Sequence, residues 1–224
     1  MSVSIPPKPS SAAAYEWQQF VRAPRRLSQQ DDPTWEIAAV FPRQGRWTAA
    51  DYLAFHSNRM MELNEGWLEI LPMPTRSHQL IAQTIYRLLF ESVTGCGEVY
   101  LAPIPVYLSA DKYREPDVVY CRPERIPKPD GYPEGADLVV EVVSDDEESR
   151  ERDLVIKRRE YAAAGITEYW IVDPSAKSVT VLTLDGTANA NYRVYGEFGS
   201  GSTATSLLLS GLAVDIDVLF SSCQ

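Results

Sequence analysis

One short segment constrains the fold of this chain more than any other. Residues 137–143 read Asp-Leu-Val-Val-Glu-Val-Val, which is apolar on both faces of a strand except for Glu141 at its centre. Strands of this kind lie inside a sheet that is covered on both faces. Because burying a lone carboxylate is costly, we expect Glu141 to face a cation, a protonated partner or the mouth of a cleft. An edge strand with Glu141 on its solvent face is the alternative.

A second acid, Asp117, stands at the head of another short apolar strand, residues 117–120. If the two strands are neighbours, Asp117 and Glu141 come together, and two like charges at close range need a divalent cation or a shared proton. Two carboxylates with open positions for water suit Mg²⁺ or Mn²⁺. Taken alone, Asp117 is equally compatible with a turn residue after a proline.

Downstream of Glu141, a helical stripe combines Asp153, Lys157 and Tyr161 at a spacing of four residues. The helix directly follows the strand of Glu141, so we expect this stripe to face the carboxylates. A solvated salt bridge on a helix surface is the alternative interpretation.

The start of that helix has two candidate caps, Ser144 with Glu147 as a capping box and Ser149 further on. A helix beginning at residue 145 would carry Lys157 past Glu141. We therefore predict a loop over residues 145–149, a helix that begins after Ser149, and contact between Lys157 and the carboxylates.

The distribution of prolines and of apolar segments along the chain predicts two parts. Residues 1–45 are rich in proline and are expected to form an arm with one helix over residues 11–21, and residues 46–224 are expected to form an α/β domain with β-hairpins. In the domain we predict helices over 49–55 and 77–92, a hairpin that joins 60–63 to 67–70, and strands over 99–108, 117–120, 137–143, 168–172, 178–184 and 192–195.

Charge and composition exclude several function classes. Lys and Arg number 21 against 31 Asp and Glu, a net charge of −10, which argues against an overall basic field for nucleic acid. Any such contact must be local, and its candidate residues are Arg76, Arg114, Arg150, Arg152, Arg158 and Arg159. No phosphate-binding glycine loop, serine-hydrolase elbow or paired-histidine zinc motif occurs. Three unpatterned cysteines and the lack of a long apolar run predict a cytoplasmic protein without a membrane partner.

Taken in order, the motifs resemble the Uma-two family of restriction-type endonucleases, within the PD-(D/E)xK nuclease superfamily. The resemblance covers about residues 46–220, and it rests on Glu62–Gly66, Ser77-His78, Glu115–Val119, Asp137–Ser144, Asp153 with Lys157 and Tyr161, Ala164–Ile166 and Glu168–Pro174. It implies a restriction endonuclease-like fold, in which helices flank a central mixed β-sheet.

The same resemblance implies roles for particular residues. Asp117 and Glu141 would be the ligands of Mg²⁺ or Mn²⁺, and Lys157 would replace the lysine that the superfamily pattern expects at position 143, where this chain has Val143. Glu62 and His78 are second-rank candidates for completing or orienting the site. A further departure is the acidic pair Asp145-Asp146, which adds negative charge near the proposed site.

The implied activity is metal-dependent hydrolysis of phosphodiester bonds in DNA. A non-catalytic binding or scaffold protein that retains the nuclease fold is the alternative, favoured by the net charge and by the acidic run at 145–148. A glycosidase built on a carboxylate pair would leave Lys157 unexplained. A homodimer is compatible with the sequence.

Overall fold

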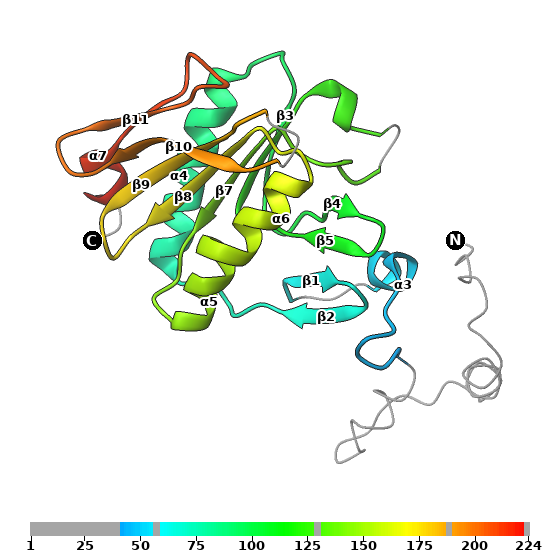
Figure 1. Cartoon of the computed structure of the whole chain (residues 1–224). Helices are drawn as coiled ribbons and strands as arrows, with labels where there is room; N and C mark the ends of the chain where they lie inside the picture. The colour runs from blue at the N-terminus through cyan, green and yellow to red at the C-terminus, as the bar shows by residue number, and fades with distance from the viewer. Residues whose placement is uncertain (1–40, 56–58, 128–130, 187–189, 222–224) are drawn as a thin grey trace, which may run out of the picture.

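A six-stranded mixed sheet forms the centre of the molecule (Figure 1). The computed structural model describes residues 41–55, 59–127, 131–186 and 190–221. The strands lie in the order β10-β9-β8-β7-β6-β3, and their bounds are β3 (Glu98–Leu101), β6 (Val118–Cys121), β7 (Leu138–Val142), β8 (Glu168–Asp173), β9 (Ser178–Leu184) and β10 (Tyr192–Phe198). Strands β7 and β8 pair in parallel, and the other neighbours are antiparallel. The predicted α/β class with a central mixed sheet is confirmed.

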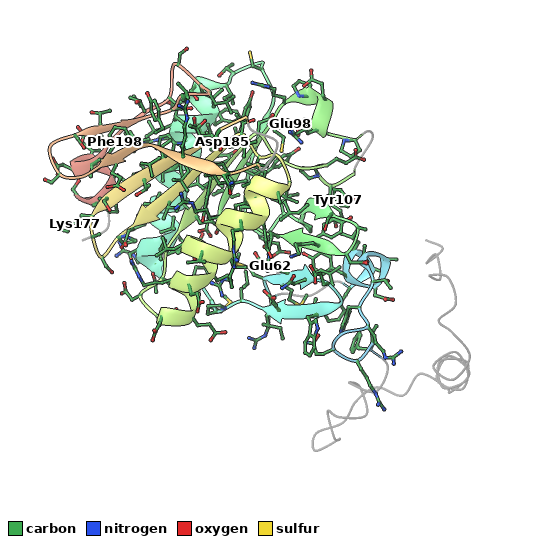
Figure 2. The ribbon with its side chains drawn as sticks, in the orientation of Figure 1. Glu62, Glu98, Tyr107, Lys177, Asp185 and Phe198 are labelled. Carbon is green, nitrogen blue, oxygen red and sulfur yellow. The ribbon has the colours of Figure 1, made fainter. Side chains whose placement is uncertain are left out.

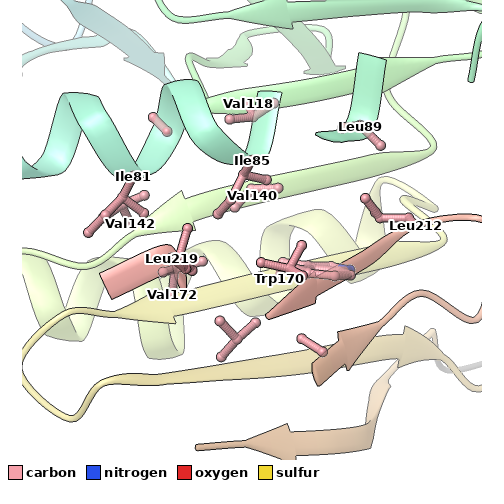
Figure 3. Packing of buried hydrophobic residues seen from close by; sticks show 14 of the residues in the cluster. Ile81, Ile85, Leu89, Val118, Val140, Val142, Trp170, Val172, Leu212 and Leu219 are labelled. Carbon is pink, nitrogen blue, oxygen red and sulfur yellow. The ribbon is translucent and has the colours of Figure 1, made fainter. Parts of the chain in front are cut away.

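Helix α4 (Arg76–Ser92) covers one face of this sheet (Figure 3). Its buried residues Ile81, Ile85 and Leu89 recur at helical spacing and pack against alternate residues of β6 and β7, among them Val118 and Val140. The two-stranded sheet of β11 (Thr203–Thr205) and β12 (Ala213–Asp215), with helix α7 (Ile216–Ser221), closes the same core.

The opposite face carries a second helical layer, which begins with α5 (Glu147–Glu151) and ends with α6 (Arg158–Ala163). Between them the segment η2 (Arg152–Lys157) is a π-helix, in which the hydrogen bonds span one residue more than in an α-helix. The apolar core on this side uses the other residues of the strands, such as Val119 and Val139. Both faces of the sheet are therefore covered, as the apolar run around Glu141 predicts.

A separate four-stranded antiparallel sheet lies beside the central one, in the order β2-β1-β5-β4. Its bounds are β1 (Met61–Asn64), β2 (Trp67–Ile70), β4 (Val106–Ser109) and β5 (Lys112–Arg114). Helix α3 (Ala49–Ala54) packs on it through Tyr52, and Thr48 caps that helix in a capping box with Asp51.

The outer edge of β2 is covered by the chain that precedes α3. Gly45 donates a backbone hydrogen bond to Gly66, and the side-chain amide of Gln44 bonds both the N–H and the carbonyl of Leu68 at 2.8 Å and 2.7 Å. Residues 41–45 thus contact the small sheet, whereas the predicted arm over residues 1–40, with its helix over 11–21, lies outside the described residues. The domain boundary at residue 45 stays a prediction.

Two predicted elements differ from the structure. The expected strand over 99–108 is two strands in different sheets, β3 and β4, because Pro103 and Pro105 interrupt the backbone donors between them. The predicted helix start after Ser149 is wrong, as is the cap at Ser144. Helix α5 begins at Glu147, because Asp146 is the N-cap and its carboxylate accepts from the N–H of Ser149.

Candidate active site

The two predicted metal ligands lie on neighbouring strands of the central sheet. Strands β6 and β7 pair with Val118 opposite Val140, and extending this register by one residue sets Asp117 opposite Glu141. Because directly opposite residues point to the same face, both carboxylates belong to the face that α5 and α6 cover. The carboxylate of Asp117 also accepts a hydrogen bond from the N–H of Val142 at 2.7 Å, which fixes its orientation.

Lys157 brings the helical layer to these strands. Its Nζ lies 2.9 Å from Oε1 of Glu141, 3.2 Å from Oε1 of Glu62 and 3.4 Å from Oδ1 of Asp153. The four side chains are almost fully buried, so these charges interact with little screening by water. One ammonium group therefore serves three carboxylates that come from β1, β7 and η2.

The helix reaches Glu141 by a different route from the predicted one. An α-helix from residue 147 would place Lys157 about 15 Å along its axis, beyond the level of Glu141. The π-helical segment η2 advances less per residue, because each of its turns holds more residues. The contact between Lys157 and Glu141 is thus present, although the reason given for it from the sequence was incorrect.

Tyr161, one turn further on, holds the same carboxylate. Its hydroxyl donates to Oε1 of Glu141 at 2.5 Å, and the phenol is fully buried. Burial raises the pKa of Glu141 to about 8, since the nearby charges of Asp153, Asp117 and Glu62 add to the effect of burial while Lys157 opposes it. The pocket thus contains more negative charge than its own cations balance.

His78 enters from the first turn of α4 and contacts Asp117. Its Nε2 lies 3.2 Å from Oδ2 of Asp117, and the two side chains are 14% and 10% exposed, which makes this the more open end of the site. Burial lowers the pKa of His78, but the hydrogen bond to Asp117 and its charge outweigh burial and raise the pKa above its ordinary value. The N-cap Thr75, which accepts from the N–H of His78, fixes this turn.

Glu62 connects the small sheet to the site (Figure 2). It is fully buried on β1, where it accepts from Nη1 of Arg114 at 2.8 Å and from the N–H of Glu115 at 3.1 Å. Burial would raise its pKa, but the charges of Lys157 and Arg114 lower the pKa to about 2. Glu62 is therefore a stable anion that holds Lys157 from the small sheet.

Arg114 is predicted from the sequence as a candidate surface contact for substrate, and that prediction is wrong. Its side chain is 1% exposed and binds three glutamates, Glu62, Glu69 and Glu160. Strand β5 pairs with β1, and Glu160 on α6 also contacts Arg114. Acidic side chains from different elements therefore meet at this point, where Arg114 balances their charge.

The remaining candidate arginines differ in their contacts and exposure. Arg150 pairs with Asp173, Arg152 lies 3.5 Å from Asp153, and Arg158 donates to the carbonyl of Tyr192. Arg76 and Arg159 are exposed.

Comparison with protein families shows which family the chain belongs to. A model of the family Uma2, described as "Putative restriction endonuclease", matches residues 48–218, about three quarters of the chain. The chain belongs to the Uma2 family. A comparison with curated proteins found no significant match.

A solved structure resembles this Uma2 protein in fold. It is the crystal structure of a "putative nuclease belonging to DUF820" from Anabaena variabilis, with 18% sequence identity and a TM-score of 0.63. The similarity covers 80% of this chain and 99% of that one. The region of similarity is thus nearly the whole of the other protein, and it shows a common fold.

The candidate site offers a divalent cation a pair of carboxylates. The described residues contain no cluster of three or more His, Cys, Asp or Glu side chains placed around one ion. Mg²⁺ is commonly held by one or two carboxylates, with water and substrate at the other positions, so the pair Asp117 and Glu141 is compatible with it. The raised pKa of Glu141 also indicates a place where a cation would be stabilised. Within the described part of the chain, the buried Nδ1 of His78 and Oδ1 of Asp153 form no hydrogen bonds.

Sequence reasoning missed part of the Uma2 site. Asp153 was seen only as part of a helical stripe, yet it is the third carboxylate at Lys157. Glu115 is also buried, bonding Tyr52 and the N–H of Met61, and burial raises its pKa to about 7. The grouping of Glu62 and Glu115 with Lys157 could not be inferred from the sequence, because it depends on the contact between the small sheet and the central one.

Proposed function

We propose that this Uma2 protein is a divalent-metal-dependent endonuclease that hydrolyses phosphodiester bonds in DNA. The observation that supports it most is the contact of Lys157 with Glu141, on a strand whose neighbour presents Asp117 on the same face. Two acids and a lysine in this relation are the parts that the PD-(D/E)xK pattern requires, and here the lysine comes from a helix. Family membership favours the same reaction.

Asp117 and Glu141 would hold Mg²⁺ or Mn²⁺. When bound, such an ion polarises a phosphoryl oxygen and lowers the pKa of a bound water. The ammonium of Lys157 lies beside Glu141, where it can orient the attacking water or offset negative charge on the transferring phosphoryl group. Lys157 stays protonated, because the charges of Glu141, Glu62 and Asp153 outweigh the effect of burial and raise its pKa.

The other side chains position these groups. Tyr161 donates to Glu141 and limits the rotation of its carboxylate, while Glu62 and Asp153 hold Lys157 from two further directions. His78 contacts Asp117 at the more open end of the site, where it can also donate to a substrate oxygen when protonated. We therefore assign Glu62, Asp153 and Tyr161 to positioning, and His78 to a position next to the substrate.

The test is cleavage of plasmid and linear duplex DNA with Mg²⁺, with Mn²⁺ and with EDTA. Glu141→Gln keeps the size of the side chain but removes the charge, and we expect it to abolish cleavage and weaken Mn²⁺ binding in calorimetry. Glu197→Gln, an exposed acid on β10, is the matched control and should change neither. Mn²⁺ binding at Glu141 without cleavage of any nucleic acid would support the non-catalytic alternative instead.

A further inference from the structure

A large aromatic side chain is exposed at the beginning of β2. Trp67 is 56% exposed, although tryptophan is usually covered in folded proteins. One side of its indole is backed by the turn over residues 43–46, since a Cβ placed on Gly45 would lie 3.7–3.8 Å from three atoms of the ring. Gly45 has φ +81°, a conformation that favours glycine, and bonds Gly66 next to Trp67. The indole is therefore a supported platform with more than half of its surface open.

Two arginines flank the residue on which the indole rests. Arg43 and Arg46 belong to the same turn, and both are exposed. Several arginines elsewhere in the chain are engaged by carboxylates, as Arg125 is by Asp137 and Arg150 by Asp173. In a chain of net charge −10, two exposed cations beside an open indole form a local site suited to an anion that carries a flat ring.

The platform lies close to the candidate active site. Trp67 pairs with Asn64 across β1 and β2, and Glu62 pairs with Glu69 two residues away. Alternation along a strand puts Trp67 on the same face as Glu62, which contacts Lys157. One strand spacing and two residues of rise separate the Cα atoms of Trp67 and Glu62 by about 8 Å. The backbone of the platform is thus close to that of Glu62, whose buried carboxylate contacts Lys157.

We propose that Trp67, Arg43 and Arg46 bind an unpaired nucleotide of the substrate strand. The base stacks on the open face of the indole, and the guanidinium groups contact the phosphates on either side. A base inside a duplex is already stacked on both faces, so a single surface indole selects a strand with unpaired bases. This inference rests on the proposed function for the nature of the ligand, and it specifies a substrate with a single-stranded segment.

The test measures binding without chemistry, using the full chain in EDTA. Fluorescence anisotropy of a labelled single-stranded oligonucleotide is compared with that of a duplex of the same length, and quenching of tryptophan emission is recorded in parallel. We expect tighter binding of the single strand, and a loss of about fivefold to more than a hundredfold in Trp67→Ala. Trp67→Phe should retain much of the affinity, because it keeps a ring.

Matched controls separate stacking from general effects. Phe90 on α4 is 55% exposed, on an element that covers the other face of the central sheet, so Phe90→Ala should leave binding unchanged. The double variant Arg43→Ala with Arg46→Ala should weaken binding and its salt dependence, whereas Arg87→Ala, an exposed residue of α4, should not. Circular dichroism and thermal midpoints verify that each variant is folded.

Three results would overturn the proposal that Trp67 stacks on an unpaired base. They are equal losses of binding in Trp67→Ala and Phe90→Ala, tighter binding of the duplex than of the single strand, and no binding of the single strand by the unaltered protein. Metal-dependent cleavage is measured separately. If cleavage occurs but single-strand binding does not depend on Trp67, the platform fails and the nuclease proposal stands. If binding depends on Trp67 but no condition gives cleavage, the nuclease proposal fails and the platform stands.

Discussion

At the scale of single residues, the ammonium of Lys157 has an unusual set of neighbours, because three buried carboxylates share it. Removing one partner of a buried ion pair normally leaves an uncompensated charge. Here the pKa of Glu141 is already raised to about 8, so Glu141 can take up a proton at neutral pH when the lysine is absent. We therefore expect the fold to tolerate loss of the lysine.

We accordingly expect Lys157→Ala to lower metal-dependent cleavage by about a hundredfold or more, because the charge beside the reacting phosphate is removed. Mn²⁺ binding should be largely retained, since Asp117 and Glu141 remain and the ion can displace the proton that Glu141 takes up. Cleavage kinetics and calorimetry measure the two effects, and Arg87→Ala is the control. Cleavage within threefold of the unaltered protein would refute the role of Lys157.

For His78 the expected effect is smaller. It orients Asp117 from one side, while the N–H of Val142 holds the same carboxylate from another. Groups that orient a metal ligand typically contribute 10- to 100-fold, so we predict a loss of about that size for His78→Ala. A loss as large as that of Asp117→Asn, measured in the same cleavage assay, would show that His78 takes part in the reaction directly.

Residue types and spacing pointed to several residues that the structure brings together at the candidate site. Glu141 is conspicuous because an acid interrupts an apolar strand, and Lys157 and Tyr161 share one face of the next helix. Arg114 could not be found in this way. Its three carboxylate partners come from β1, β2 and α6, so its burial depends on contacts between elements far apart in the sequence.

At the scale of elements, a cluster of charges clamps α6 to the small sheet. Glu160 on α6 accepts from Nε of Arg114 at 2.8 Å, and from Nζ of Lys112 at 2.8 Å. Burial would raise the pKa of Glu160, but the bonds to Arg114 and Lys112 lower it below its ordinary value. The unfolded chain therefore binds a proton at Glu160 more readily than the folded protein does. The stabilisation is present above the unfolded pKa of about 4.3, and it is lost as the pH falls through the folded pKa.

From this we predict that Glu160→Gln lowers the free energy of unfolding at pH 7 by about 1–3 kcal/mol, the usual contribution of a hydrogen bond to a charged group. The difference from the unaltered protein should shrink as the pH falls below about 4. Urea unfolding at several pH values measures this, with Glu151→Gln, an exposed acid on α5, as the control. A difference that does not vary with pH would contradict the ion-pair interpretation.

Elements with local signals were predictable, and their exact ends were not. The capping box at Thr48, the turn between β1 and β2 and the long apolar period of α4 each act within a few residues. The start of α5 depended on a competition between Ser144, Asp146 and Ser149, all of which can cap a helix. The π-helical segment, which contains the buried Asp153 and Lys157, was not predicted from the sequence.

At the scale of the whole molecule, the described hydrophobic clusters are built from residues that follow position 46. Phe41 adds to the cluster around α3, where its ring lies 4.8 Å from that of Phe55 and 6.1 Å from that of Trp47. The family match also begins at residue 48. We therefore predict that the folding unit begins near residues 41–47.

Two truncations test where the folding unit begins. We expect a chain that starts at residue 41 to melt within about 3 °C of the full chain, a difference of about 1 kcal/mol. A chain that starts at residue 46 lacks Phe41, Gln44 and Gly45, which contact the small sheet, and should melt several degrees lower. Calorimetry compares the two, and a large drop already at residue 41 would show that the first 40 residues stabilise the body.

The side chain of Gln44 has a consequence for solubility. An open strand edge offers unpaired donors and acceptors to any other molecule in solution, and it can recruit further chains into a growing assembly. At the edge of β2 the side-chain amide of Gln44 bonds the N–H and the carbonyl of Leu68, as a neighbouring strand would. A side-chain amide offers no further backbone groups to which another strand could add. Gln44→Ala should therefore leave the monomer folded but raise its tendency to aggregate with concentration, as light scattering would record. The Gln44 amide thus blocks the pairing of a further strand with β2 at Leu68.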